Sequence, residues 1–337
     1  MATKDYTIAT LGSHSALQIL KGAKDEGFKT LCICLEGREK PYRMFKVADE
    51  IITIKNYEEF LQLQDELIEK NCIIIPHASF IAYLGTDAVE NFKVPYYGEK
   101  DILHYESDRA VEREWLQKAG LKLPMIFDKP EDIDRSVIVK FHGALGGMGY
   151  FLANSPEDFA EKIKSHPDEK YVIQEYILGV PIYAHYFQSI LNDELEVMSF
   201  DKRYESNVDS LGRISARDQM ALAQVDPSYV VTGNIPIVLR ESLLPKIIDM
   251  GERVVAQSKK LVNRGLFGPF CLEMIATPNQ EIYTFEISAR IVAGTNPFIR
   301  GTPYTDLRYD KPVSTGRRIA MEIKQAIEQD RIKEILS

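Results

Sequence analysis

The sequence predicts an α/β fold for its first hundred residues and α+β folds for the remainder. Three observations lead to this class. Strand-like and helix-like segments alternate up to about residue 100, a glycine-rich loop joins two strand-like runs at residues 139–151, and an acidic hairpin lies within residues 268–290. A chain of 337 residues is long enough for two or three domains. We therefore expect an N-terminal domain of residues 1–100, a small lobe of residues 101–178 and a C-terminal lobe of residues 179–337.

Composition and charge exclude several classes of protein. The net charge of −9 argues against general binding to nucleic acid or to membrane surfaces. No apolar run approaches the ~20 residues that span a bilayer, and residues 1–10 lack a signal-peptide pattern. The four cysteines lack zinc-site spacing and three of them lie in strand-like runs, so we expect buried, reduced thiols and a cytoplasmic protein. These four are Cys32, Cys34, Cys72 and Cys271.

The first hundred residues are typical of a doubly wound parallel sheet. Residues 5–11, 28–35 and 72–76 are predicted strands, and the last is continuously apolar, as a strand buried on both faces would be. Ligands of such sheets bind beyond the carboxyl ends of the strands, where loops 12–15 and 76–79 lie. Loop 12–15 also precedes a helix N-terminus, which favours an anion. The alternative is that Ser13 and Ser15 only cap the helix and that the histidines are incidental.

The loop at residues 139–151 reads VKFHGALGGMGYF and does not match the standard phosphate loops. A Walker A loop places its lysine after the glycines, whereas Lys140 precedes them here. The flanking runs, residues 136–141 and 150–153, are strand-like, and the next helix begins only near Ser155 and Pro156. We interpret the segment as a flap between two strands, with a flexible hairpin that binds no ligand as the alternative. Its glycines are Gly143, Gly146, Gly147 and Gly149.

The acidic hairpin consists of two strand-like runs around a turn at residues 277–280. A two- or four-residue loop would pair Glu273 with Thr284 and Cys271 with Glu286, so that the two glutamates are diagonal neighbours roughly 7–8 Å apart. Such a pair can hold a divalent cation together with nucleotide phosphates. An odd-length loop would instead place the glutamates on opposite faces, and a plain exposed acidic pair is a further alternative.

The two faces of this hairpin are predicted to differ in polarity. The predicted polar face carries Glu273, Thr284, Glu286 and Ser288, and the predicted core face carries Leu272, Met274, Tyr283, Phe285 and Ile287. Arg290 follows directly, and arginine is well suited to phosphates and acyl phosphates. The last charged segment, from about Arg317 to Leu336, predicts a solvated amphipathic helix without assigned chemistry.

Together, the α/β domain, the flap with its upstream lysine and the two-glutamate hairpin resemble the ATP-grasp superfamily. Within it, the chain is similar to the formate-dependent synthetases of purine biosynthesis, which formylate the ribotide AICAR to FAICAR. The resemblance covers essentially the whole chain. It is carried by SHSALQILKGAKDEGF, YVIQEYILGVPIY, DKRYESNVD, TGNIPIVLRESLL, GPFCLE and FEISARIVAGTN.

The resemblance implies roles for the matching positions. The ribotide would contact His14, Ser79 and Asn234. The ATP phosphates would lie on Lys140 and the flap glycines Gly143, Gly146, Gly147 and Gly149. The backbone of Gln174, Glu175, Tyr176 and Ile177 would border the adenine, and Glu205 would be a further carboxylate at the nucleotide. Glu273 and Glu286 would hold Mg²⁺, with Mn²⁺ as a possible substitute. Lys140 and Arg290 would stabilise the developing charge.

The implied activity is a carboxylate–amine ligase reaction in IMP biosynthesis, from AICAR, formate and ATP through formyl phosphate, in a homo-oligomer without nucleic-acid or membrane partners. The alternatives are a ligase for another small carboxylate and a catalytically weak ribotide- or nucleotide-binding protein. Two positions depart from the pattern. Ser288 stands where many ATP-grasp enzymes have asparagine, with Asn296 as the candidate to compensate. The flap carries Leu145 and Met148 where this family often has basic residues, which predicts weaker attraction of phosphate.

Overall fold

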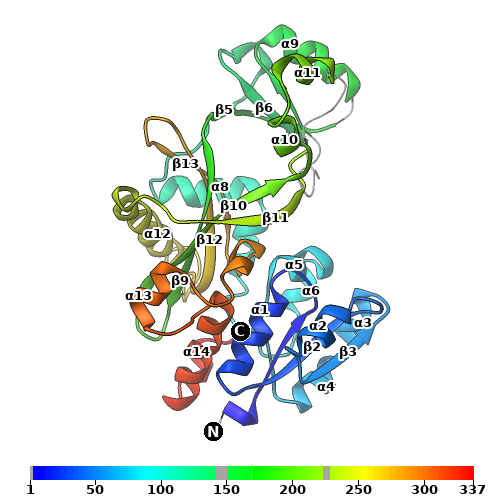
Figure 1. Ribbon diagram of the computed structural model, residues 1–337, viewed down its shortest axis with the longest axis vertical. Coiled ribbons are helices and arrows are strands. Elements are labelled where there is room, and N and C mark those ends of the chain that lie inside the picture. The colour runs from blue at the N-terminus through cyan, green and yellow to red at the C-terminus, as the bar shows by residue number, and fades with distance from the viewer. Residues whose placement is uncertain (1–2, 142–149, 168, 223–227) are drawn as a thin grey trace.

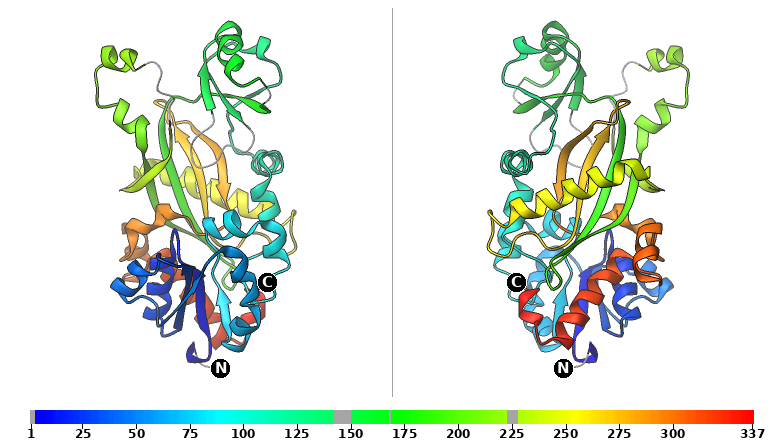
Figure 2. Two further views of the ribbon diagram at one scale, coloured as in Figure 1. Left: turned by 90° about the vertical axis from the view of Figure 1, so that its right-hand side faces the viewer. Right: turned by 90° about the vertical axis from the view of Figure 1, so that its left-hand side faces the viewer.

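The computed structural model describes residues 3–141, 150–167, 169–222 and 228–337, except for the side chains of Lys4, Ser79, Ile81 and Asn207. Three sheets follow one another along the long axis of the molecule (Figure 1). A parallel N-terminal sheet lies at one end, a five-stranded antiparallel central sheet in the middle, and a small antiparallel sheet at the other end (Figure 2). This arrangement confirms the predicted combination of α/β and α+β folds.

The N-terminal sheet has the strand order β3-β2-β1-β4, and all of its strands run parallel. Its strands are β1 Thr7–Leu11, β2 Lys29–Leu35, β3 Glu50–Ile54 and β4 Cys72–Ile74. The helices of this region are α1 Ala16–Asp25, α2 Lys40–Phe45, α3 Tyr57–Gln62, α4 Gln64–Glu69, α5 Ala78–Leu84 and α6 Thr86–Glu90. Strand β3 was not predicted, because its short run lies half-exposed at the sheet edge and lacks the continuous apolar pattern of its neighbours.

The small sheet has the order β5-β8-β6-β7 and contains the strands that flank the predicted flap. Its elements are β5 Ile126–Phe127, β6 Val137–Phe141, β7 Tyr150–Ala153, β8 Tyr171–Glu175 and α9 Pro156–Lys162. Strands β6 and β7 pair antiparallel up to Lys140 opposite Tyr150, which confirms the two flanking strands. The flap itself, residues 142–149, lies outside the described residues. Ser155 caps α9 as predicted, because its hydroxyl accepts a hydrogen bond from the Asp158 N–H.

The central sheet has the order β11-β10-β9-β12-β13. Its strands are β9 Val180–Ser189, β10 Glu194–Glu205, β11 Val231–Ile237, β12 Gly268–Ala276 and β13 Ile282–Ser288. The helices between and beyond these strands are α10 Ser206–Leu211, α11 Ala216–Ala221, α12 Leu244–Ser258, α13 Pro303–Tyr309 and α14 Thr315–Glu328.

Helices α7 Ile102–Ser107 and α8 Arg109–Lys118 pack beside the central sheet rather than in the small one. Helix α8 lies against α12, where the Trp115 indole N–H donates to the Val254 carbonyl over 3.2 Å. The domain limits at residues 100 and 178 stay a prediction. None of the described helices is both long and apolar enough to cross a bilayer, and the four cysteines are buried thiols, as expected.

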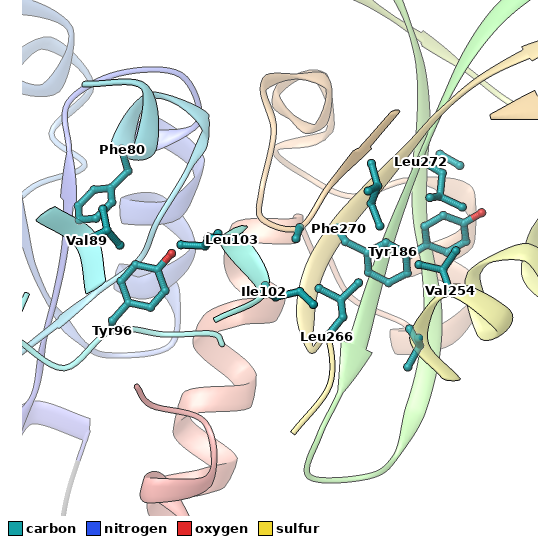
Figure 3. Close-up of a cluster of buried hydrophobic side chains, with 14 of the residues drawn as sticks. Phe80, Val89, Tyr96, Ile102, Leu103, Tyr186, Val254, Leu266, Phe270 and Leu272 are labelled. Carbon is teal, nitrogen blue, oxygen red and sulfur yellow. The ribbon is translucent and has the colours of Figure 1, made fainter. Parts of the chain in front are cut away.

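One hydrophobic core continues from the N-terminal region into the central sheet (Figure 3). Phe80 and Tyr96 lie on the N-terminal side, Ile102 and Leu103 of α7 lie between the two parts, and Phe270 belongs to β12. Because this apolar contact is continuous, the loops of the N-terminal sheet are held in a fixed position relative to the central sheet.

The expectation that the C-terminal helix is solvated was wrong. Helix α14 packs against α1, and Ile319 and Ile323 belong to a core shared with the N-terminal sheet. Two of its charged side chains are buried together: Arg318 forms ion pairs of 2.8 Å with Glu196 and 2.9 Å with Glu322. The charge pattern was misleading because these charges have partners inside the protein rather than in water.

Candidate active site

One face of the central sheet carries polar side chains on all five strands. The strand register places Glu273 opposite both Glu286 and Tyr183, and Tyr183 opposite Asp201. The alternation of side chains along each strand then brings further polar groups to the same face. From one edge of the sheet to the other, this polar face consists of Glu286 and Ser288, Cys271 and Glu273, Tyr183 and His185, Asp201 and Arg203, and Asn234.

The two glutamates of the hairpin share a face, but by a different pairing from the predicted one. Ala276 pairs with Ile282, so the loop spans 277–281 and has an odd length. A β-bulge between Glu273 and Met274 then shifts the register by one residue and brings Glu273 directly opposite Glu286. The predicted pairs, Glu273 with Thr284 and Cys271 with Glu286, were therefore wrong, although the predicted shared face is confirmed.

The bulge also reverses the faces predicted for three neighbouring residues. Thr284 pairs with Met274 on the core side and is buried, whereas Tyr283 pairs with Ile275 on the other side. Phe285 packs with Cys271 and Tyr183 on the polar face. Its ring lies 5.9 Å from the ammonium nitrogen of Lys140, so the hairpin contacts the small lobe here.

The glutamate pair fits a divalent cation. The Glu273 side chain is buried, and its Oε1 pairs with Arg203, while its Oε2 has no hydrogen-bond partner in the described part of the chain. The Glu286 side chain is exposed. The surrounding protein raises the pKa of Glu286 to about 7, first through desolvation and then through the nearby Glu273 carboxylate. Because the Glu286 side chain is exposed, solvent reduces the desolvation effect, and a bound cation would reverse the effect of Glu273.

No cluster of three or more His, Cys, Asp or Glu ligands occurs within the described ranges. A cation held by Glu273 and Glu286 would therefore take its other ligands from phosphate oxygens and water. This division of ligands is typical of Mg²⁺ bound together with a nucleotide.

Cationic side chains surround the glutamate pair. Lys140 projects from β6, and its Nζ lies 3.3 Å from Gln174 Oε1. Desolvation lowers the pKa of Lys140, Glu286 raises it in part, and Arg109 lowers it again. The Arg203 guanidinium lies over the Tyr183 ring, 3.9 Å from its centre. Sequence reasoning missed Arg109 and Arg203, and for Arg203 the usable signal was its spacing of two residues from Glu205 on one strand.

Arg290 is close to this cluster but already has an acidic partner. Its Nη2 forms a 2.6 Å ion pair with Glu106 of α7, and both side chains are largely buried. Glu106 also accepts a hydrogen bond from the Ala289 N–H over 2.9 Å. The predicted charge-stabilising arginine is thus held in position by a helix that the sequence did not connect with the site.

Glu112 of α8 is a second acidic residue that the sequence did not assign to the site. It is buried, and it accepts a hydrogen bond from the Ile287 N–H at the edge of β13. Desolvation and then the Glu286 carboxylate raise the pKa of Glu112 to about 9. The raised pKa favours the neutral form of Glu112.

The stability of Glu112→Gln relative to the parent protein is expected to depend on pH. A carboxyl group whose pKa is raised by folding takes up a proton on folding, so it destabilises the fold increasingly as pH rises from about 4.3 towards 9. Glutamine keeps the acceptor for Ile287 and does not ionise. In metal-free buffer, the melting temperature of the variant minus that of the parent should thus become more positive between pH 5.5 and 8.5. A constant or falling difference would contradict the assignment.

The N-terminal loops reach towards the polar face of the central sheet. His14 is exposed at φ 41°, an uncommon backbone conformation for a residue other than glycine, and its ring stacks on that of His77 with centroids 5.9 Å apart. Partial desolvation by the neighbouring loops, followed by the charge of Arg290, lowers the pKa of His14. His77 is buried, its Nε2 lies 2.8 Å from the Leu11 carbonyl oxygen, and burial lowers its pKa to about 3, so it is a neutral structural residue.

The capping alternative for the first loop does not hold for Ser15. This residue occupies the N-cap position of α1, but its side chain accepts no capping hydrogen bond, and none of the residues that the structure describes binds its buried hydroxyl. Ser79 lies in α5, and its side chain is outside what the structure describes.

The 3-10 helix η5, Ala293–Phe298, connects the His14 loop with the central sheet. Asn296 Nδ2 donates to the His14 carbonyl over 3.0 Å, and Asn296 Oδ1 accepts from Gln18 Nε2 over 2.8 Å. Both polar groups of Asn296 thus take part in this connection, and its compensation for Ser288 stays a prediction. Asn234 lies on β11, which also contacts η5, and its Nδ2 donates to Asp201 over 2.8 Å.

The strand predicted to border a nucleotide base has several of its polar groups in use. The N–H groups of Glu175 and Tyr176 donate to the carbonyl oxygens of Met125 and Ser136, over 2.8 and 2.9 Å. The Glu175 carboxylate pairs with Arg135 at 3.2 Å. The Gln174 side chain lies beside Lys140.

Glu205 lies at the end of β10, half-buried, beside a β-bulge. Burial and then Asp209 raise the pKa of Glu205, and its charge in turn acts on Tyr150 at the end of the flap. The Tyr150 ring packs against Tyr229, with centroids 5.2 Å apart. The small lobe therefore touches the C-terminal part of the chain next to Glu205.

Comparison with known proteins identifies the family. A family model described as a domain of unknown function, DUF1297, matches residues 158–337, and one described as a protein of unknown function, DUF1246, matches residues 8–127. A 5-formaminoimidazole-4-carboxamide-1-(β)-D-ribofuranosyl 5′-monophosphate synthetase of Pyrococcus abyssi is 57% identical, with 98% of each chain covered. The synthetase of the same name from Methanocaldococcus jannaschii is 50% identical, with 99% of this chain and 95% of the relative covered. The chain belongs to this synthetase family.

Solved structures agree with the assignment to this family. An IMP biosynthesis protein from Thermococcus kodakaraensis is similar with a TM-score of 0.77 and 29% identity, covering 98% of this chain and 100% of that one. The ADP complex of an N5-carboxyaminoimidazole ribonucleotide synthetase gives a TM-score of 0.69 at 16% identity, covering 96% and 78% of the two chains, which shows a shared fold alone. The chain has the ATP-grasp fold, as the family resemblance implied.

Proposed function

We propose that the chain is an ATP- and formate-dependent ligase that formylates AICAR to FAICAR in IMP biosynthesis, with ADP and phosphate as the other products. The observation that carries this proposal is the identity of 47–57% to synthetases named for the product, over nearly the whole chain. The polar face supports it, because two acidic ligands and several cations lie there together, as phosphoryl transfer requires.

The chemistry proceeds in two balanced steps. A formate oxygen attacks the γ-phosphorus of ATP, the bond to the β-phosphate oxygen breaks, and formyl phosphate and ADP result. The 5-amino group of AICAR then attacks the formyl carbon, the carbon–oxygen bond to phosphate breaks, and the amine loses a proton. The chain's contribution is to position the reactants, to neutralise charge and to exclude water from the acyl phosphate.

We assign the ATP site to the cleft between the small lobe and the polar face. Glu273 and Glu286 would hold Mg²⁺, which neutralises charge on the phosphates when bound, and Mn²⁺ is an alternative ion. Lys140 and Arg203 lie beside this pair and would contact the transferred phosphoryl group, together with the flap. Gln174 to Ile177 would border the adenine and Glu205 the ribose side, while Arg290, held by Glu106, would stabilise charge from the N-terminal side.

We assign the ribotide to the space between the N-terminal loops and η5. His14 and Ser79 lie at the carboxyl ends of β1 and β4, and Asn234 lies across η5 from His14. Asn234 belongs to the edge strand β11 and Glu286 to the opposite edge strand β13, so a ligand held by His14 and Asn234 would lie over the β11 side of the polar face. The charge of Arg290 acts on both His14 and Glu286, which places these two groups around one arginine.

Replacement of His14 by alanine is expected to weaken AICAR binding with little change for ATP. The side chain is exposed, and its loss leaves the His77 ring and the α1 N-terminus in place. The loss of one ligand hydrogen bond should reduce affinity about tenfold. Calorimetric titration of each ligand separately checks this, and a fall in nucleotide affinity instead would show that the loop is misassigned.

The direct test of the proposed reaction is ADP production by the purified protein with ATP and Mg²⁺. AICAR and formate should both be required, and the product should gain one formyl group by mass. ADP formed with another small acid instead of formate would favour a different ligase. Binding of AICAR and ATP without turnover would favour the binding-protein alternative. Light scattering tests the expected homo-oligomer, and cell fractionation the expected cytoplasmic location.

A further inference from the structure

A chain of three buried or half-buried polar side chains crosses the central sheet beneath η5. His185 Nε2 lies 2.7 Å from Asp201 Oδ1, and Asn234 Nδ2 lies 2.8 Å from Asp201 Oδ2. His185 and Asp201 are almost completely buried, with exposed fractions of 1% and 0%. Among the described residues, His185 Nδ1 is buried without a hydrogen-bond partner, so Nε2 is the ring nitrogen that binds Asp201.

The hydrogen bond to Asp201 determines which end of the Asn234 amide faces away from the sheet. Asn234 presents its NH₂ group to Asp201, because Nδ2 donates and the carboxylate oxygen Oδ2 accepts. Its carbonyl oxygen, Oδ1, then points the other way, and no donor among the described residues binds it. The side chain thus offers the cleft an acceptor rather than a donor.

The backbone of η5 lies directly over Asp201 and His185 and links these two residues to the His14 loop. A Cβ atom at Gly294 would lie 2.3 Å from Asp201 Oδ1 and 2.8 Å from His185 Cε1, so only glycine allows η5 to lie this close. Two residues further on, Asn296 binds the His14 carbonyl. The Asp201–His185 pair therefore sets both the orientation of Asn234 and the height at which η5 holds the His14 loop.

We propose that Asp201 and His185 are positioning residues that direct the Asn234 carbonyl oxygen at an N–H group of the ribotide base. This inference rests on the proposed function and extends it. It predicts that the site selects ribotides that carry an amine or amide donor at this point, because a ligand that offers only an acceptor would face Asn234 Oδ1 without a hydrogen bond.

An exchange of the two side chains tests the proposal. In Asp201→Asn, the new amide oxygen must accept from His185, so its NH₂ group faces Asn234. Asn234 must then turn its oxygen inward and present a donor to the ribotide. In Asn234→Asp, two carboxylates meet and repel each other. Each single variant should bind AICAR about 10- to 100-fold more weakly, with unchanged ATP affinity.

The double variant Asp201→Asn, Asn234→Asp should restore the acceptor. The amide introduced at position 201 then donates to the carboxylate introduced at position 234, which leaves one carboxylate oxygen facing the ligand. Its AICAR affinity should exceed that of either single variant by about tenfold or more. Glu322→Gln is the matched control, since Glu322 is a buried carboxylate that accepts from Ser189 and pairs with Arg318. It should alter thermal stability and leave AICAR binding unchanged.

If Asp201→Asn fails to fold, His185 provides a second test. His185→Gln keeps a donor for Asp201 and should keep AICAR affinity, whereas His185→Leu removes the donor and should lower it.

Calorimetric AICAR titration of each folded variant, without ATP, gives the decisive result. Single variants with parental affinity, or a double variant no better than the singles, would overturn the proposal. A parent protein that does not bind AICAR would instead refute the proposed function.

Discussion

Glu286→Gln is expected to lose turnover while it keeps the fold. The Glu286 side chain is exposed, and its backbone pairing with Glu273 does not depend on its charge. Glutamine has nearly the same shape but is a poor ligand for Mg²⁺. Because a metal ion supplies several kcal/mol of charge stabilisation in phosphoryl transfer, kcat should fall at least about a hundredfold. ADP formation measures the activity, and circular dichroism with thermal melting confirms the fold.

The matched control lies on the same hairpin. Glu281→Gln removes an exposed carboxylate that pairs with Lys122 on the surface at 2.8 Å. Exposed pairs of this kind contribute about 0–1 kcal/mol, so both turnover and melting temperature should change little. Near-parental turnover in Glu286→Gln would contradict the metal-ligand assignment, and equal losses in both variants would point to damage to the hairpin.

Gly22→Ala is expected to destabilise the protein through the crossing of α1 and α14. A Cβ atom at Gly22 would lie 2.3 Å from the Arg317 backbone nitrogen, and one at Gly316 would lie 2.4 Å from the Gln18 carbonyl oxygen. The contact joins backbone to backbone, so no side chain can rotate away. Overpacking of this kind costs about 1–3 kcal/mol, and a fall in melting temperature of several degrees should be observed.

Because the added methyl group of Gly22→Ala would push α1 away from α14, the substitution should also weaken AICAR binding. Gln18 of α1 holds Thr295 and Asn296 of η5, so a displaced α1 moves the His14 loop relative to the central sheet. Gly212→Ala is the control, because the nearest atom to a Cβ there is 3.6 Å away and the backbone is helical. It should be neutral or slightly stabilising. Equal melting temperatures for the two variants would refute the close helix contact.

The hairpin shows how far the sequence predicts the site. Alternation of polar and apolar residues correctly placed Glu273 and Glu286 on one face, although the odd loop alone would have separated them. The bulge that restores the shared face leaves no mark in the sequence, because one inserted residue looks the same as a change of strand phase. The faces of Tyr283, Thr284 and Phe285 were wrong for this reason.

Groups that act through distant partners could not be predicted. Arg203, Glu112 and Glu106 contact β12, β13 or the residue that follows β13 from other strands and helices, at separations of 70 to 183 residues. Helix α14 was interpreted as solvated because the burial of Arg318 depends on a distant partner. Glu322 lies only 4 residues away from Arg318, but Glu196 lies 122 residues away and has no local signal. Local patterns identify elements, whereas such pairings are fixed by packing of the whole chain.

The central claim is that formate is activated by phosphorylation before it reaches the amine. The most direct measurement follows ¹⁸O from doubly labelled formate through one turnover with ATP, Mg²⁺ and AICAR. Formation of formyl phosphate predicts one labelled oxygen in the inorganic phosphate and one in the formyl group of the product. Unlabelled phosphate, with formylated product still formed, would show that water rather than formate attacks ATP and would contradict the mechanism.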